Sequence, residues 1–351
     1  MTVEDKKPEA VLVTGASGYI ASWVVKYLLD EGFAVHGTVR SLNEESRYRH
    51  LQALAGAKER LRLFEADLLH EGSFDAAMEA CAAVFHTASP FRAVGIKNPR
   101  MELIEPAVSG TGNVLRSAGR SPGVRRVVLT SSVAAIYGDA ADVQEYPGGI
   151  MTEANWNNSS SDSHQAYSYS KTLAEKEAWK IAKEQNRWQL VVINPGFVFG
   201  PSLTPRTDST SINSLLAMLN GKYRAGVPDY RFAMVDVRDV ARAHVNALLR
   251  PGSSGRHILA AETLGFVEMA RLLREYRGDR YPIPKSALPS WLLYAVGPFM
   301  GFGWKFNRRN LGIPVAFDNT YSKTDLGIDY RPMRQTLLDH LEQIERDGLL
   351  G

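Results

Sequence analysis

Short apolar runs alternate with segments of helical period over the first half of the chain. The apolar runs, which predict strands, occupy residues 11–14, 34–39, 61–66, 83–87, 127–131 and 190–193. The amphipathic segments, which predict helices, occupy residues 19–30, 104–119 and 168–184. A repeated strand–helix order is typical of a parallel sheet wrapped by crossover helices. The pattern therefore predicts an α/β fold built on a doubly wound parallel sheet of six or seven strands.

Beyond about residue 200 this pattern breaks into connections rich in Pro, Gly and Arg. Helical pieces remain at residues 212–219, 237–249, 267–276 and 334–346. Such a region is too interrupted for a second complete sheet, so it predicts a smaller, mixed cap. We expect a main domain at residues 1–200, to which part of 236–262 returns, and a cap formed mostly by residues 201–351.

The most apolar stretch of the cap lies at residues 288–304. It contains Trp291 and Trp304 but is interrupted by Gly297-Pro298. A membrane helix requires about 20 continuous apolar residues, and this stretch falls short of that. It therefore predicts a packed cap segment or a pocket wall in preference to a membrane contact.

Composition excludes several classes of protein. The chain has 351 residues, of which 44% are hydrophobic, and this is enough for a large core without external staples. Its 41 Lys and Arg mix along the chain with 38 Asp and Glu, so we expect neither nucleic acid nor a membrane as partner. Cys81 is the single cysteine, and the first ten residues are polar where a secretory signal would be apolar. A reducing, cytoplasmic location is therefore expected, and no metal site is predicted.

A glycine pattern stands directly between the first strand and the first helix. Gly15, Gly18 and Ala21 follow one another at three-residue spacing. Glycine lets backbone amides approach an anion, and the helix start behind them contributes about half a positive charge. This pattern predicts the phosphate cradle of a dinucleotide-binding domain, as opposed to a plain structural turn.

Cofactor choice is expected to depend on the end of the second strand, where an acid would hold the ribose hydroxyls of NAD. Arg40 stands there, and no acid follows before Glu44. Because a guanidinium can pair with a 2′-phosphate, NADPH is predicted over NADH, with Arg47 or Arg49 as possible helpers. Asp67, after the third strand, is expected to touch the adenine or to cap a helix.

Two residues of the helix after residue 166 have the spacing of a proton-transfer pair. Tyr167 and Lys171 are four apart, which places them on one helix face about 6 Å from each other. A neighbouring ammonium favours ionisation of a phenol, whose usual pKa is about 10. Tyr169 is only two residues from Lys171 and points elsewhere. Such a pair also arises by chance on a helix surface.

Ser132 gives this pair a partner. It follows the apolar strand at residues 127–131, and the carboxyl edge of a parallel sheet is where ligands bind. Ser132 could hydrogen-bond a carbonyl oxygen that Tyr167 protonates; the alternative is a polar strand end.

These residues together resemble the extended branch of the short-chain dehydrogenase/reductases, which have a Rossmann fold. Within that branch the chain is similar to the group of dihydroflavonol reductases, cinnamoyl-CoA reductases and microbial aldehyde or ketone reductases. The likeness runs from about Val11 to Leu350. The motifs that carry it are Thr14-Gly-Ala-Ser-Gly-Tyr-Ile-Ala21, Gly37-Thr-Val-Arg40, Phe85-His-Thr-Ala-Ser-Pro90, Pro106-Ala-Val-Ser-Gly-Thr-Gly-Asn113, Leu129-Thr-Ser-Ser132, Tyr167 with Lys171, Asn194-Pro-Gly-Phe-Val-Phe-Gly-Pro201, Val235-Asp-Val-Arg-Asp-Val-Ala241 and Asp325-Leu-Gly327.

The resemblance implies roles for individual residues. Ser132, Tyr167 and Lys171 would form the catalytic set, with Tyr167 as general acid and Lys171 also holding the nicotinamide ribose. Asn113 is expected to be structural first and a proton-relay member second, and His86 to be structural. The predicted cofactor-binding set is Gly15, Ser17, Gly18, Tyr19, Ile20, Arg40, Asp67, Leu68, Thr87, Ala88, Ser89, Lys171, Pro195 and Val198.

Substrate contacts are expected from residues near this edge of the sheet, namely Phe91, Val133, Tyr137 and Phe197. Aromatic residues there are equally typical of plain core. A mostly apolar pocket would suit an aryl or alkyl carbonyl better than a nucleotide sugar. The chain departs from the flavonoid enzymes at residues 138–163 and 288–304, so flavonoid specificity is not predicted.

The sequence thus predicts an NADPH-dependent reductase that converts an aldehyde or ketone to an alcohol by hydride transfer. One alternative is a nucleotide-sugar epimerase or dehydratase, or a steroid-type dehydrogenase, that uses NAD. A second is a non-catalytic NADPH sensor. Physiological substrate, stereochemistry and direction of the reaction are not determined by the sequence, and the protein could be a monomer or a homodimer.

Overall fold

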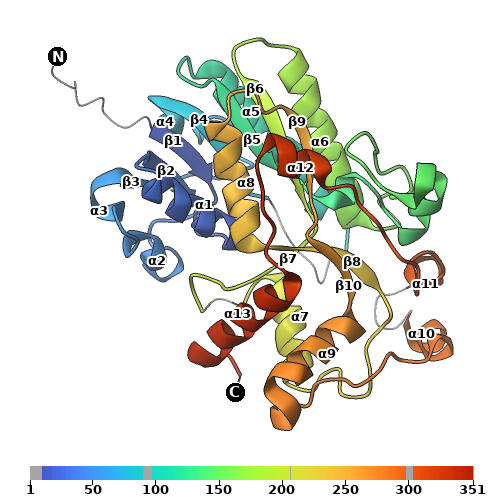
Figure 1. Cartoon of the computed structure of the whole chain (residues 1–351). Helices are drawn as coiled ribbons and strands as arrows, with labels where there is room; N and C mark the ends of the chain where they lie inside the picture. The colour runs from blue at the N-terminus through green and yellow to red at the C-terminus, as the bar shows by residue number, and fades with distance from the viewer. Residues whose placement is uncertain (1–9, 90–96, 206, 298–302, 351) are drawn as a thin grey trace.

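The computed structural model describes residues 10–89, 97–205, 207–297 and 303–350 (Figure 1). Its centre is a parallel sheet with the strand order β3-β2-β1-β4-β5-β6-β9. The seven strands are β1 (Ala10–Thr14), β2 (Ala34–Val39), β3 (Leu61–Glu65), β4 (Cys81–His86), β5 (Arg126–Thr130), β6 (Gln189–Pro195) and β9 (Gly255–Leu259). The order reverses between β1 and β4, so the predicted doubly wound Rossmann-like sheet is confirmed.

Helices cover both faces of this sheet because its strands are apolar on both sides. Val11 and Val13 of β1 face the cluster formed with α1 (Tyr19–Asp30) and α8 (Val237–Leu249). Leu12, between them, faces the opposite cluster, to which α5 (Glu105–Arg120) and α6 (Ala166–Lys183) contribute. The alternation of strand side chains thus fixes which helix lies on which side.

A smaller mixed sheet follows the main one along the chain, in the order β10-β8-β7. Its strands are β7 (Phe197–Phe199), β8 (Arg231–Asp236) and β10 (Glu262–Gly265). β8 runs parallel to β7 and antiparallel to β10. The helices of the cluster on this sheet are α7 (Thr210–Leu219), α9 (Phe266–Arg277) and α13 (Met333–Arg346). The sequence did not predict this small sheet, and the domain division at residue 200 stays a prediction.

The described part of residues 288–304 contains the short helix α10 (Ser290–Val296) and the first residue of α11 (Trp304–Asn310). Leu293 is buried, but Trp291 is 70% exposed and Trp304 is 69% exposed. The stretch is therefore only partly packed, because a helix of two turns buries a single face. A short helix, α12 (Thr320–Asp325), comes later in the chain.

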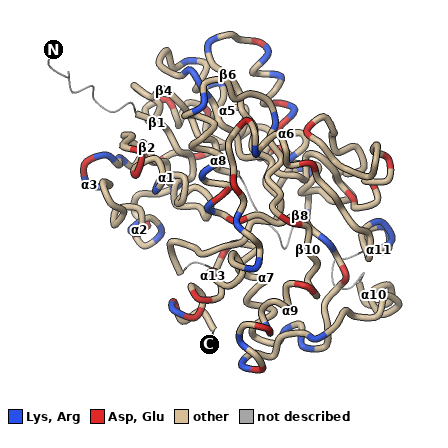
Figure 2. Tube along the Cα trace, in the orientation of Figure 1, with Lys and Arg blue, Asp and Glu red and all other residues tan. Residues whose placement is uncertain are grey.

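Charged residues of both signs are spread over the described chain (Figure 2). Among the described residues, none of the helices has the length and apolar character needed to cross a bilayer. The cytoplasmic location stays a prediction.

Candidate active site

The turn between β1 and α1 allows close approach of the backbone. Gly15 has φ +60°, and a Cβ there would lie 3.1 Å from the Cβ of Ala88. The Gly18 amide donates to the Gly15 carbonyl at 2.9 Å, and Gly18 directly precedes α1. No side chain caps the start of α1, so its free backbone amides and the positive end of its dipole can bind an anion.

The Tyr19 and Ile20 side chains, which follow Gly18, make contacts within the protein. The Tyr19 hydroxyl donates to the Gly200 carbonyl at 2.5 Å, and Ile20 packs against the core beside α1. Ser17 lies between the two glycines in the turn. The cofactor contacts predicted for Ser17, Tyr19 and Ile20 stay predictions.

Arg40 stands immediately after β2 and is exposed. Its guanidinium has no hydrogen-bond or ion-pair partner among the residues that the structure describes. In contrast, Arg47 pairs with Glu44, and Arg49 pairs with Glu45 at 3.3 Å. Arg40 is thus the one of these three arginines whose charge is open to a phosphate.

Asp67, shortly after β3, and Asn113, in the middle of α5, have structural partners. Asp67 accepts a hydrogen bond from the Leu69 amide at 2.8 Å, which closes a turn and not a helix start. The Asn113 amide donates to the Leu68 carbonyl at 2.9 Å. Asn113 therefore ties α5 to the segment after β3, as its expected structural role requires.

Thr14, the last residue of β1, organises the end of β4. Its hydroxyl oxygen accepts from the Thr87 amide at 3.1 Å and from the Ala88 amide at 3.0 Å. Because both lone pairs are thus used, its proton goes to Nδ1 of His86, 3.0 Å away. Burial lowers the pKa of His86 to about 3, assisted by the charge of Lys171. His86 is consequently neutral and serves a structural role.

The three residues predicted to be catalytic meet at the carboxyl edge of the sheet. Ser132 follows β5, and its hydroxyl accepts from the Ala134 amide at 3.1 Å and lies close enough to Tyr167 to lower the pKa of that phenol. Lys171 Nζ lies 6.0 Å from the centre of the Tyr167 ring. It also donates to Ser89 Oγ, after β4, at 3.1 Å. The pair on α6 therefore reaches the ends of two neighbouring strands.

Burial, and not the charge of Lys171, dominates the pKa of Tyr167. Tyr167 keeps 37% of its surface exposed, yet desolvation by the surrounding protein raises its pKa to about 12, and the hydrogen bond with Ser132 opposes this only in part. Desolvation also lowers the pKa of Lys171 to about 8, against the opposing charge of Glu175. Tyr167 is therefore protonated near neutrality, which is the form that a general acid requires.

A buried ion pair that the sequence analysis missed lies behind this group. The Glu175 carboxylate accepts hydrogen bonds from Arg256 Nε at 2.5 Å, from the Ser131 hydroxyl at 2.5 Å and from the Asn194 side-chain amide at 2.8 Å. The same Asn194 amide donates to the Ser132 carbonyl at 3.1 Å. Glu175 stands one helical turn after Lys171, which is the only sequence signal that could have indicated it.

The remaining predicted residues have mixed surroundings. Pro195 ends β6, and Val198 is buried in β7. Val133 is buried in an apolar cluster against which Tyr137 packs, and the Tyr137 ring lies 5.4 Å from that of Phe317. Phe197 packs on Phe199 and Phe232. Phe91 lies outside the described residues. The substrate roles of Val133, Tyr137, Phe197 and Phe91 stay predictions.

A doubly wound sheet with a glycine turn after its first strand and a Ser–Tyr–Lys group at the same edge defines a nucleotide-dependent oxidoreductase class. Residues 11–261 match the model of the NAD dependent epimerase/dehydratase family. The chain belongs to this family, and its resemblance to the extended short-chain dehydrogenase/reductases is confirmed.

Individual relatives agree with this assignment. The chain is 46% identical over 338 residues to cinnamoyl-CoA reductase CAD2 of Medicago truncatula, covering 95% of each protein. It is 42% identical over 284 residues to tetraketide alpha-pyrone reductase 1 of Arabidopsis thaliana, covering 80% of this chain and 85% of the relative. Its fold is similar to Gre2 of Candida albicans in complex with NADPH, with a TM-score of 0.80, 30% identity and coverage of 97% and 99%.

Proposed function

We propose that the protein is an NADPH-dependent reductase that converts an aldehyde or ketone to an alcohol. The observation that carries this proposal is the meeting of Ser132, Tyr167 and Lys171 at the sheet edge that also holds the glycine turn. The similarity to two plant reductases and to a Gre2 structure with NADPH supports the same reaction class.

The chain's own residues fit NADPH. A side chain at Gly15 would crowd Ala88, so glycine leaves room for a diphosphate against the start of α1. Arg40 would hold the 2′-phosphate, since it has no other partner among the described residues and no acid replaces it. The bound cofactor supplies the hydride, and the protein contributes placement and proton transfer.

Tyr167 is the proton donor of the proposed reaction. Its raised pKa keeps the phenol protonated, and Ser132 stands near enough to the same hydroxyl to affect that pKa. A substrate carbonyl oxygen placed beside both hydroxyls would accept two hydrogen bonds and then the Tyr167 proton, as the carbonyl carbon receives hydride. Lys171, whose ammonium faces the Tyr167 ring, stabilises the phenolate that remains.

The substrate is proposed to be an aryl or alkyl carbonyl. Val133, Tyr137 and Phe197 would supply an apolar wall on the substrate side of Ser132. Arg40 speaks against a nucleotide sugar as substrate, because it stands after β2 where an acid would be expected for tightly held NAD.

A substrate panel tests this proposal. The purified protein is mixed with NADPH or NADH and with aromatic aldehydes, aliphatic ketones or β-keto esters, and loss of the reduced-cofactor absorbance is followed. We expect turnover with NADPH and at least one carbonyl class. Absence of turnover across the panel, with consumption of a UDP-sugar by protein that was purified with bound NAD, would reverse the assignment to the epimerase alternative.

A further inference from the structure

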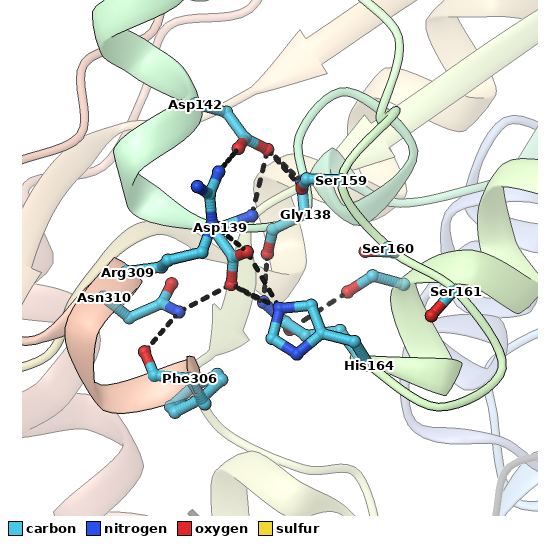
Figure 3. Close-up of polar contacts among 12 residues, drawn as sticks. Gly138, Asp139, Asp142, Ser159, Ser160, Ser161, His164, Phe306, Arg309 and Asn310 are labelled. Atoms are coloured by element: carbon cyan, nitrogen blue, oxygen red, sulfur yellow. Dashed lines mark hydrogen bonds and ion pairs between the residues drawn. The ribbon is translucent and has the colours of Figure 1, made fainter. Parts of the chain in front are cut away.

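A buried polar cluster lies beside the start of α6 (Figure 3). At its centre is Asp139, whose side chain is 0% exposed. The side chains that donate to its carboxylate are His164 at 2.8 Å, Gln165 at 2.8 Å, Arg309 at 2.6 Å and Asn310 at 2.7 Å. A buried carboxylate is costly unless it is paired and hydrogen-bonded, and here both oxygens are satisfied.

The cluster joins segments that are distant in the chain. Asp139 belongs to the segment that follows Ser132, whereas Arg309 and Asn310 lie on α11 (Figure 3). The attachment is reciprocal, because Asn310 also accepts from the Ala140 amide at 2.8 Å. Arg309 binds Asp142 in addition, at 2.6 Å. The helix α11 is thus fixed to the segment that leaves the Ser132 turn.

The same carboxylate reaches the residue from which α6 starts. Gln165 caps α6 and has φ +57°, in the left-handed region that a residue with a Cβ rarely adopts. Its side-chain amide donates to Asp139 and to the Gly138 carbonyl. Two hydrogen bonds therefore hold Gln165 in this conformation, only two residues before Tyr167.

His164 adds a further hydrogen bond on the same side. Its backbone amide and carbonyl pair with Ser161, so the loop before α6 closes on itself next to Asp139. The carboxylate stays ionised near neutrality, since hydrogen bonds from Asn310, His164, Gln165 and Arg309 lower the pKa of Asp139 against the opposing effect of burial. The two residues that directly precede α6 are thus both hydrogen-bonded to one charged group.

We propose that Asp139 is a positioning residue for the reduction: by joining α11 to the residue that starts α6, it holds the Tyr167 hydroxyl at the substrate carbonyl. This inference rests on the proposed function, because it requires Tyr167 as the proton donor. It also links the short helix α11, about 170 residues further along the chain, to the geometry of proton transfer.

The test compares Asp139→Asn with the unchanged protein in the full chain. The amide keeps the shape of the side chain but removes its charge and one of its acceptor oxygens. A displacement of the phenol by about 1 Å is expected to lower kcat by roughly tenfold to a hundredfold. KM for the carbonyl and Kd for NADPH stay within about twofold, because the β1–α1 turn takes no part in the cluster. The solvent deuterium isotope effect on kcat rises, since proton transfer becomes slower.

Asp239→Asn is the matched control. Asp239 is a buried carboxylate on α8 that pairs with Arg331, much as Asp139 pairs with Arg309. Its loss is expected to lower the thermal midpoint but to leave kcat and the isotope effect unchanged below that midpoint. A purely structural Asp139 would give the same result as this control, which would overturn the proposal.

A second pair of variants decides the question if Asp139→Asn does not accumulate as folded protein. His164→Leu removes the hydrogen-bond donor and is expected to reproduce the fall in kcat and the larger isotope effect. His164→Gln restores an N–H and is expected to recover most of the activity. Equal activity in the two variants would overturn the positioning role.

Tyr167→Phe separates the two proposals. If it abolishes reduction while Asp139→Asn retains full kcat, the reductase assignment stands and the positioning role fails. If Tyr167→Phe retains full activity, both fail.

Discussion

Replacement of Arg40 by glutamine is expected to weaken NADPH binding selectively. Hydrogen bonds to charged groups contribute about 1.5–3 kcal/mol. Arg40 is exposed, so solvent and salt screen its attraction for a phosphate, and we take the lower part of that range, about 1.5–2 kcal/mol. This corresponds to a roughly 10–30-fold rise in Kd for NADPH. Binding of NADH, which lacks the 2′-phosphate, is expected to change by less than about twofold, because no other interaction of the cofactor is altered.

The measurement is titration of the reduced-cofactor fluorescence at low and at moderate ionic strength. The Arg40 contribution should shrink as salt is added. Arg49→Gln is the control, since Arg49 already pairs with Glu45, and its loss should leave both Kd values nearly unchanged. Equal weakening of NADPH by the two variants, or equal weakening of NADPH and NADH by Arg40→Gln, would refute this account of cofactor choice.

Three further predictions concern the remaining parts of the site. Because the pKa of Lys171 is about 8, its ammonium is present below that pH and is lost above it. The value of kcat/KM for reduction should therefore fall as pH rises through about 8. A flat profile to more alkaline pH would exclude the role of the Lys171 ammonium in stabilising the phenolate. Glu175→Gln breaks a buried ion pair with Arg256 and should lower the free energy of unfolding by about 3–5 kcal/mol in urea titrations, whereas a change below 1 kcal/mol would mean that the pair adds little. Gly15→Ala places a Cβ on a left-handed backbone and 3.1 Å from the Cβ of Ala88. It should lower the free energy of unfolding by about 1–2 kcal/mol and weaken NADPH binding. An unchanged free energy of unfolding and an unchanged Kd for NADPH would show that the turn has room for a side chain.

Local pattern was sufficient to predict much of the fold. The predicted segments at residues 19–30, 34–39 and 237–249 coincide with α1, β2 and α8. Their bounds follow from short-range rules, namely the periodicity of apolar residues and the glycine that precedes α1. β9 and the small sheet were not predicted, because segments such as Gly255–Leu259 and Glu262–Gly265 have no continuous apolar run. The exposed Trp291 and Trp304 were likewise unexpected, since composition alone does not tell which face of a short helix is covered.

The residues of the candidate site likewise divide into those with a local sequence pattern, which were predicted, and those without one, which were missed. The glycine turn, Arg40 and the Tyr167–Lys171 spacing are local features and were predicted from the sequence. Glu175 was missed because its partner Arg256 is 81 residues away. Asp139 was missed because Arg309 is 170 residues away and a lone acid in a loop has no distinguishing pattern. The raised pKa of Tyr167 depends on the density of surrounding protein, which only the folded structure supplies.

Single-turnover reduction by Tyr167→Phe, compared with Tyr169→Phe, tests the central claim most directly. Both tyrosines lie on α6, but Tyr167 is the one whose pKa Ser132 lowers and whose ring faces Lys171. The account predicts that Tyr167→Phe lowers the rate of alcohol formation by about 10²–10⁴-fold with Kd for NADPH nearly unchanged, and that Tyr169→Phe has no comparable effect. Equal rates in the two variants would contradict it.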